Sequence, residues 1–163
     1  AAGGFTDSHI PAGFAPFGIQ AINGDLYVTY AMQDADREDD VQGSGLGYVD
    51  VYDPNGYLIR RLISRGHLNA PWGMAMAPAG FGWMSNRLLV ANFGDGTINA
   101  YDPATGWFMG SLHSSWGKPI KIDGLWGISF GNGYANQSVN TLYFTAGPED
   151  EEHGAYGRID VMQ

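Results

Sequence analysis

The sequence predicts an all-β domain, and three observations favour it. Apolar residues make up 44% of the 163-residue chain, which is enough for one domain with a hydrophobic core. Twenty-five glycines and eight prolines, without collagen periodicity, indicate many tight turns between short elements. A glycine-centred motif also recurs along the chain, which indicates repeated structural units. We therefore expect a single domain, residues 1–163, built of repeated β-sheets without long helices.

The repeated motif is an aromatic residue followed by glycine. It occurs at Phe17-Gly18, Trp72-Gly73 and Trp126-Gly127, at nearly equal intervals. A stretch dense in β-branched and aromatic residues follows each motif, as is typical of strands. Second strands are expected at DLYVTY from Asp25, RLLVAN from Arg87 and TLYFTA from Thr141, and third strands at GYVDVYD from Gly47, GTINAYD from Gly96 and GRIDVM from Gly157.

Fourth strands are expected in the first two repeats only. The segments DPNG (53–56) and DPATG (102–106) predict tight hairpins, because Asp, Pro and a closing Gly suit successive turn positions. The strands YLIRRLI and WFMGSLH follow these hairpins. The third repeat stops at Met162 and Gln163 without a fourth strand.

Four antiparallel strands per repeat are typical of a β-propeller blade. The glycine lets innermost strands approach closely, and we expect Trp72 and Trp126 to pack between blades. Propellers usually have about four to eight blades, so the chain predicts half of a six-bladed ring. The three blades are expected at about 14–63, 69–112 and 123–162, with 1–13 as the remnant of a preceding outer strand and its loop.

The motifs PAGFAPFGIQ, LNAPWGMAMAPAGFG, NFGDGTINAYDPATG, DGLWGISFGNG and TLYFTAGPEDEEHG carry a resemblance. They resemble the C-terminal half of an uncharacterised family of secreted bacterial β-propeller proteins, some of which carry a C-terminal sorting signal, and more distantly NHL-like repeats. The resemblance implies a secreted, periplasmic or extracellular protein. It brings no established activity, and it implies that the front half of the ring lies outside this chain.

The charge balance excludes some partners. Seventeen acidic residues against eight basic ones give a formal net charge of −9, which opposes binding to nucleic acid and to anionic membranes. No apolar run is long enough to span a membrane, and the absence of cysteine excludes disulfides and thiolate chemistry. Cationic or neutral ligands, such as a small molecule or a glycan, fit better.

In a meander of four strands, the loops between second and third strands and those between blades emerge on one face. All four histidines, His9, His67, His113 and His153, fall in these loops beside two acidic clusters. If the protein is an enzyme, we expect His67, His113 and His153 to form the active face, with Glu152 as general acid or base. A structural role for each histidine is the alternative.

Calcium is the expected cofactor. Carboxylates are the hard oxygen ligands that calcium prefers, although the sequence lacks the glycine and final glutamate of an EF-hand loop. A solvated acidic loop is the alternative. The candidate ligands are Asp34, Asp36, Glu38, Asp39, Asp40 and Glu151.

The sequence is compatible with three functions. The first is a metal-assisted hydrolase or lactonase, and the second is a non-catalytic extracellular module that binds a glycan or a protein. The third is a structural half-ring. In every case the ring needs a partner, which is either a second copy that forms a homodimer or a separate chain that carries the front half. In the homodimer, the N-terminal segment of one copy would pair with the last blade of the other.

Overall fold

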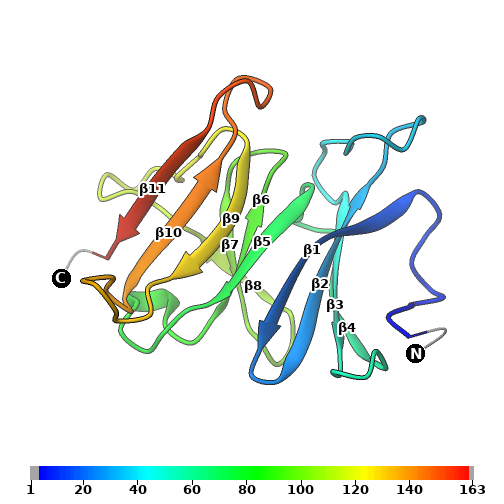
Figure 1. Ribbon diagram of the computed structural model, residues 1–163, viewed down its shortest axis with the longest axis horizontal. Helices are drawn as coiled ribbons and strands as arrows, with labels where there is room; N and C mark the ends of the chain where they lie inside the picture. Colours follow the sequence, from blue (N-terminus) through cyan, green and yellow to red (C-terminus); the bar gives the residue numbers. More distant parts are fainter. Residues whose placement is uncertain (1–3, 162–163) are drawn as a thin grey trace.

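The computed structural model describes residues 4–161, which form three antiparallel β-sheets (Figure 1). Sheet 1 contains β1 (Phe14–Ile22), β2 (Asp25–Met32), β3 (Gly47–Tyr52) and β4 (Leu58–Ser64). Sheet 2 contains β5 (Pro71–Met76), β6 (Leu88–Asn92), β7 (Ile98–Tyr101) and β8 (Phe108–Ser111). Sheet 3 contains β9 (Leu125–Phe130), β10 (Thr141–Ala146) and β11 (Ala155–Asp160). The all-β prediction is confirmed, and one short 3-10 turn, η1 (Gly82–Met84), is the helical element of the described residues.

Each sheet is a simple meander, because its strands pair in chain order. Sheets 1 and 2 have four strands and sheet 3 has three, and within residues 4–161 they do not close into a ring. The last strand begins at Ala155, two residues before the predicted start at Gly157. The fourth strand of sheet 2 is shorter than WFMGSLH and covers Phe108–Ser111.

The two predicted hairpins form through the side chains of their first aspartates. The Oδ1 atom of Asp53 accepts hydrogen bonds from the backbone amides of Asn55 and Tyr57, each at 2.9 Å. Asp102 Oδ1 does the same for the amides of Ala104 and Thr105, at 3.0 and 2.9 Å. These contacts are local in sequence, so the turn motifs alone were enough to predict them.

Sheet 2 lies between sheets 1 and 3, and glycines allow the close approach of the inner strands (Figure 1). A Cβ atom on Gly18 of β1 would collide with the carbonyl oxygen of Trp72 on β5. A Cβ on Gly73 of β5 would lie 2.6 Å from the carbonyl oxygen of Trp126 on β9. The expected role of the repeated glycine is therefore confirmed at these two positions.

Strand alternation separates two inter-sheet cores. One face of β6 places Leu88 and Val90 against sheet 1, and the other places Leu89 and Ala91 against sheet 3; all four side chains are fully buried. Both faces of sheet 2 are therefore covered, as expected of a central layer.

The segment before β1 lies across the outer part of sheet 1. The amide of Phe5 donates to the carbonyl oxygen of Gly56 at 2.7 Å. Arg61 of β4 pairs with Asp7 and, at 3.2 Å, with the fully buried Asp50 of β3. Residues 4–13 contain no strand, and the rest of the predicted remnant, residues 1–3, lies outside the described residues.

Candidate functional site

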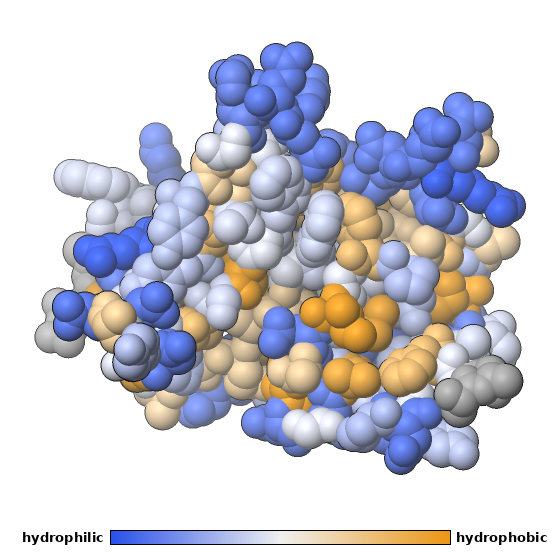
Figure 2. All heavy atoms as spheres, viewed as in Figure 1, coloured by the Kyte–Doolittle hydropathy of each residue, from blue (hydrophilic) through white to orange (hydrophobic). Residues whose placement is uncertain are grey.

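The upper face, as we call it, is formed by the loops 33–46, 93–97, 121–124 and 147–154. These loops come from all three sheets and leave them at the same end (Figure 1). Figure 2 shows hydrophilic side chains gathered along this edge of the molecule. The shared end follows from the meander topology, because alternate connections of an antiparallel sheet emerge on the same side.

Three aromatic rings meet beneath these loops and form an aromatic triad of Phe17, Trp72 and Phe93. The ring centroids of Phe17 and Trp72 are 4.4 Å apart, and that of Phe93 lies 6.0 Å from Trp72 and 6.3 Å from Phe17. Trp126 continues the row, 6.5 Å from Trp72. Phe17, Trp72 and Trp126 bridge neighbouring sheets, as expected for packing residues, but all four rings are only half-buried. Their remaining surface is available to a ligand.

Carboxylates surround the triad. Two basic side chains, Arg37 and Lys121, lie in the same four loops. Such an excess of carboxylates creates a negative potential that attracts cations. The acidic residues of the upper face are Asp34, Asp36, Glu38, Asp39, Asp40, Asp95, Asp123, Glu149, Asp150, Glu151 and Glu152.

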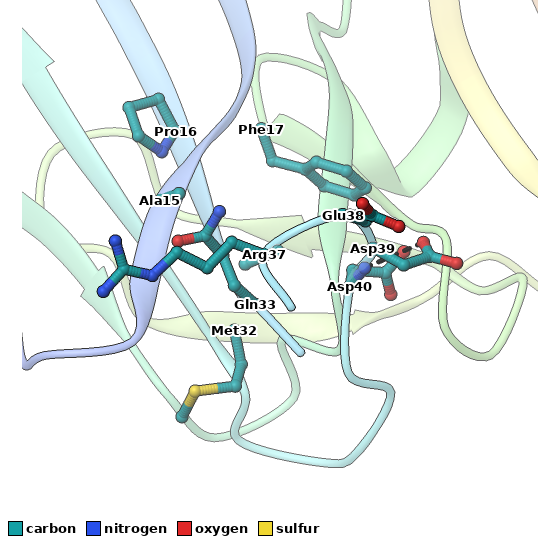
Figure 3. Close-up of a pocket in the computed structure, with 10 residues that line it drawn as sticks. Ala15, Pro16, Phe17, Met32, Gln33, Arg37, Glu38, Asp39 and Asp40 are labelled. Carbon is teal, nitrogen blue, oxygen red and sulfur yellow. Dashed lines mark hydrogen bonds between the residues drawn. The ribbon is translucent and has the colours of Figure 1, made fainter. Parts of the chain in front are cut away.

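A first hollow of about 140 Å³ lies on the Phe17 side of the triad (Figure 3). Glu38, Asp39 and Asp40 line it together with Phe17, and the guanidinium of Arg37 points away from their carboxylates (Figure 3). The hollow therefore presents negative charge beside an aromatic ring.

Asp40 is the most perturbed acid of this hollow. Burial, together with the nearby carboxylates of Asp39 and Glu151, raises the pKa of Asp40 to about 6. Within residues 4–161 its buried Oδ2 atom has no hydrogen-bond partner. A buried oxygen of this kind is costly unless it is protonated or meets a donor or a cation.

Two of the predicted calcium ligands instead stabilise their own loop. Asp34 Oδ1 accepts a hydrogen bond from the amide of Glu38 at 3.0 Å. Asp39 Oδ1 accepts one from the amide of Asp40 at 2.8 Å (Figure 3). The acidic run thus has a structural role in shaping the loop, a role that its composition did not reveal.

Loop 147–154 brings a further carboxylate to the triad. Glu149, Asp150 and Glu151 have positive φ angles of 58°, 52° and 65°, which side-chain-bearing residues rarely adopt in succession. The amide of Glu149 donates to Asp123 Oδ2 at 3.0 Å, and Trp126 Nε1 donates to Glu151 Oε1 at 2.7 Å. This conformation places the Glu151 carboxylate at the indole N–H edge of Trp126, and its charge contributes to the raised pKa of Asp40.

A second hollow of about 320 Å³ lies on the Phe93 side of the triad. Asp95, Asp123 and Asp150 contribute three carboxylates to it, and Lys121 contributes one ammonium group. The sequence interpretation missed Phe93, Asp95 and Asp123. Each of these loops contains a single aspartate, whereas the sequence prediction selected the histidines and the two acidic clusters.

The predicted catalytic histidines have three different sets of neighbours. His67 stacks on Phe108 of β8 with ring centroids 3.7 Å apart. His113 Nδ1 lies 2.7 Å from the carbonyl oxygen of Ser111, in another hollow with Met84 and Ile159. His153 Nε2 pairs with Glu149 Oε2 at 3.3 Å, on the upper face.

Of the predicted catalytic set, His153 and Glu152 share loop 147–154, and the side chain of Glu152 is exposed. His9, also expected on this face, lies 3.3 Å from Asp7 beside sheet 1. Catalysis by His67, His113 and His153 stays a prediction.

In the described part of the chain, no three His, Asp or Glu side chains are arranged to hold a metal ion. Among the predicted ligands, the charge of Glu151 contributes to the raised pKa of Asp40 from another loop, and Asp36 and Glu38 are exposed. Calcium binding stays a prediction. No helix among residues 4–161 is long and apolar enough to span a membrane.

No protein-family model matches the chain. The chain is similar to uncharacterised proteins of Acanthamoeba polyphaga mimivirus. Protein R640 is 38% identical over 138 residues, which cover 84% of this chain and 25% of R640. Protein R648 is 37% identical over 157 residues, which cover 96% of this chain and 38% of R648. Protein L690 is 36% identical over 151 residues, which cover 92% of this chain and 39% of L690.

These relatives overturn the resemblance to a secreted bacterial family. They are viral proteins, so the similarity points to a viral family, and their names assign no activity. The chain spans two-fifths or less of the length of these relatives.

Proposed function

We propose that the three sheets are consecutive blades of a β-propeller, and that their upper face is a non-catalytic binding surface for a basic protein segment. The observation that carries the second part is the aromatic triad of Phe17, Trp72 and Phe93 between two acidic hollows. Binding to a protein partner is one of the functions that the sequence left open.

The repeated contact between inner strands supports the blade arrangement. Gly18 meets the backbone of Trp72, and Gly73 meets the backbone of Trp126, so the step from sheet 1 to sheet 2 resembles the step from sheet 2 to sheet 3. Equal steps between meander sheets are typical of propeller blades, and a six-bladed ring would need three more sheets.

The chemistry of the face favours a cationic partner. Half-buried rings attract a guanidinium or ammonium group placed over their faces, and nearby carboxylates add to this attraction. Glu38 and Asp39 lie on one side of the triad, and Asp95 and Asp123 lie on the other. An extended segment with two basic side chains could use both hollows while its backbone crosses the rings.

Titration calorimetry with a peptide that contains lysine and arginine tests the proposal. The control peptide has glutamine in place of each basic residue. We expect the basic peptide to bind, and the Glu38→Gln, Asp95→Asn double variant to bind it about tenfold more weakly, because two partly screened charges are lost. Asp25→Asn, at the opposite end of sheet 1, is the matched charge control and should bind normally.

Other results would contradict the proposal. Equal affinity for the basic and glutamine peptides would remove the electrostatic argument. Binding of neutral oligosaccharides, with no binding of the basic peptide, would favour the glycan alternative over the protein partner.

A second candidate, a calcium-assisted hydrolase or lactonase, draws support from Asp40. Its buried Oδ2 atom and raised pKa, beside Asp39 and Glu151, are what a site for a divalent cation would produce in the absence of the cation. A bound calcium ion would supply a Lewis acid that polarises an ester carbonyl. Asp39, Asp40 and Glu151 are the nearest candidates to hold it, and their side chains would have to move to do so, because they are not arranged as a metal site in the described residues.

Calcium itself is the probe for this second candidate. Millimolar calcium should raise the melting temperature of the wild-type protein and leave that of Asp40→Asn unchanged. Hydrolysis of lactones or esters should then require calcium. A melting temperature that responds to neither calcium nor a chelator would eliminate the candidate.

A further inference from the structure

Two rings of the aromatic triad lie where the strand pairing is irregular. In sheet 1 the register shifts around Phe17, and in sheet 2 it shifts between Pro71 and Met74, a stretch that includes Trp72. Bulges of this kind turn a side chain out of the normal alternation of a strand. In Figure 3 the ring of Phe17 points toward the carboxylates of the first hollow, whereas Pro16 lies away from them. The bulges therefore help to present the rings to the upper face.

The same strand ends are poorly suited to pair with a β-strand of a partner. Pro16 directly precedes Phe17, and Pro71 directly precedes Trp72, and proline has no amide hydrogen to donate. The carbonyl oxygen of Trp72 already accepts a hydrogen bond from Thr29 Oγ1 at 3.2 Å. A segment that crossed the triad as a β-strand would give up backbone hydrogen bonds to water without regaining them from β1 and β5. Strand addition is therefore disfavoured at this site.

A polyproline II helix avoids this cost. Its backbone makes no internal hydrogen bonds, and each proline removes one amide that would otherwise need a partner. Proline-rich segments of this conformation dock on grooves lined by aromatic side chains. The triad offers such a lining, because the ring of Trp72 is tilted by 46° from that of Phe17 and by 55° from that of Phe93. Tilted rings form ridges against which proline rings can pack.

Trp72 also offers a hydrogen-bond donor. Trp126 Nε1 donates to Glu151 Oε1, but within residues 4–161 no hydrogen bond involves Trp72 Nε1. The buried side-chain atoms of this part of the chain that have no partner are Asp40 Oδ2 and Tyr101 Oη, so the unpaired Trp72 Nε1 is accessible to solvent. The carbonyl oxygens of a polyproline II segment have no partner within the segment. One of them can accept the indole hydrogen.

We propose that the partner of the upper face is a proline-rich basic segment, which lies across the aromatic triad in the polyproline II conformation and accepts a hydrogen bond from Trp72 Nε1. This inference rests on the proposed function and adds the conformation of the bound segment. Glu38 and Asp39 attract a basic side chain into the first hollow, and Asp95 and Asp123 attract one into the second. Prolines between the two basic residues keep the segment extended before it binds, which reduces the entropy lost on binding.

Titration calorimetry with pairs of peptides of equal length and charge tests the proposal. Both peptides of a pair have a basic residue at each end; one has prolines between them, and the other has glycines and serines. The number of intervening residues is varied from pair to pair, because a polyproline II helix rises about 3.1 Å per residue. At the length that fits best, we expect the proline peptide to bind about tenfold more tightly than its counterpart, because it is preorganised.

Trp72→Phe tests the hydrogen bond separately, because it keeps an aromatic ring and removes the indole N–H. We expect this variant to bind the proline peptide about fivefold more weakly, as for the loss of one neutral hydrogen bond. Trp107→Phe, at the opposite end of sheet 2 where Trp107 is 75% exposed, is the matched control and should bind normally. Circular dichroism and the melting temperature check that both variants are folded.

A measurement on the wild-type protein does not depend on the folding of a variant. In ¹H–¹⁵N spectra, the indole signal of Trp72 should shift when the proline peptide is added, and that of Trp107 should not. Equal affinity for both peptides of every pair would overturn this inference and leave the proposed function standing, whereas binding of neither would overturn both. An unchanged Trp72 indole signal, or unchanged affinity of Trp72→Phe, would overturn the proposed hydrogen bond.

Discussion

Single residues on the upper face are held in conformations that local propensity disfavours. Three consecutive residues, Glu149 to Glu151, adopt left-handed backbone angles, and the result is the hydrogen bond from Trp126 Nε1 to Glu151. Strain of this kind persists only where surrounding contacts determine it. The loop therefore holds a carboxylate at the N–H edge of the Trp126 ring.

Replacing Asp150 by glycine should stabilise the protein. Asp150 has a φ of 52°, where a side chain costs energy that glycine avoids, so we expect a gain of about 1 kcal/mol in the free energy of unfolding. Urea denaturation provides the measurement. Asp36→Gly, in the other acidic loop and without a positive φ, is the control and should bring no gain. Equal effects of both substitutions would show that charge rather than backbone strain is responsible.

Asp40 should make stability depend on pH. Since its pKa of about 6 in the folded protein lies above the ordinary value of 3.8, the folded state binds this proton more tightly than the unfolded chain. The contribution of Asp40 favours folding below pH 4 and is lost as the pH rises from about 4 to about 6.

Asp40→Asn should remove this loss. At pH 7 we expect the variant to be more stable than the wild type by about 1–2 kcal/mol, a range reduced for partial solvent screening. Denaturation curves at pH 4, 5, 6 and 7 give the comparison, with Asp25→Asn as the control for the loss of one charge. Parallel pH profiles of wild type and Asp40→Asn would contradict the prediction.

At the scale of strands, substitution of the repeated glycines by alanine should lower the free energy of unfolding by different amounts, although the sequence motifs around the glycines are alike. Gly73→Ala places a Cβ 2.6 Å from the carbonyl oxygen of Trp126 and 2.8 Å from the amide nitrogen of Ile128, both backbone atoms that cannot move aside. We expect a loss of about 2–3 kcal/mol in the free energy of unfolding, as for overpacked cores.

Gly127→Ala is the matched variant on β9. Its new methyl group meets Thr145 Oγ1 at 3.3 Å, so the variant should lose less than about 1 kcal/mol when measured at a concentration where the chain is monomeric. Similar losses for both alanine variants would argue against the difference in packing between the two inner strands.

The strands and hairpins could be predicted because their determinants are local. Asp53 and Asp102 bond to amides a few residues away, and the alternation along β6 follows from the strand period alone. The third repeat shows the limit of this reasoning. Its motif placed the last strand at Gly157, but pairing with β10 extends it back to Ala155.

The site could be predicted only in part, because side-chain directions depend on distant neighbours. The topology correctly brought the two acidic loops to one face, and Asp40 lies near Glu151 there. The ring of His67, however, stacks on Phe108, a partner distant in the sequence. Sequence spacing contains no information about that contact.

At the scale of the whole molecule, the three sheets are protected to different degrees. Among residues 4–161, sheet 2 is covered on both faces, sheet 1 is partly covered by the segment before β1, and sheet 3 is packed on sheet 2 through one face. Local stability generally follows such differences in burial.

The rate of amide hydrogen exchange should therefore increase from sheet 2 to sheet 3. Amides of β6 should exchange slowest and those of β11 fastest, because Leu88 to Ala91 are fully buried whereas Tyr156 is 71% exposed. Mass spectrometry of peptides that cover Leu88–Asn92 and Ala155–Asp160 measures the two rates. Equal protection of β11 and β6 would contradict this prediction, because it would show that exchange does not follow the difference in burial between the two strands.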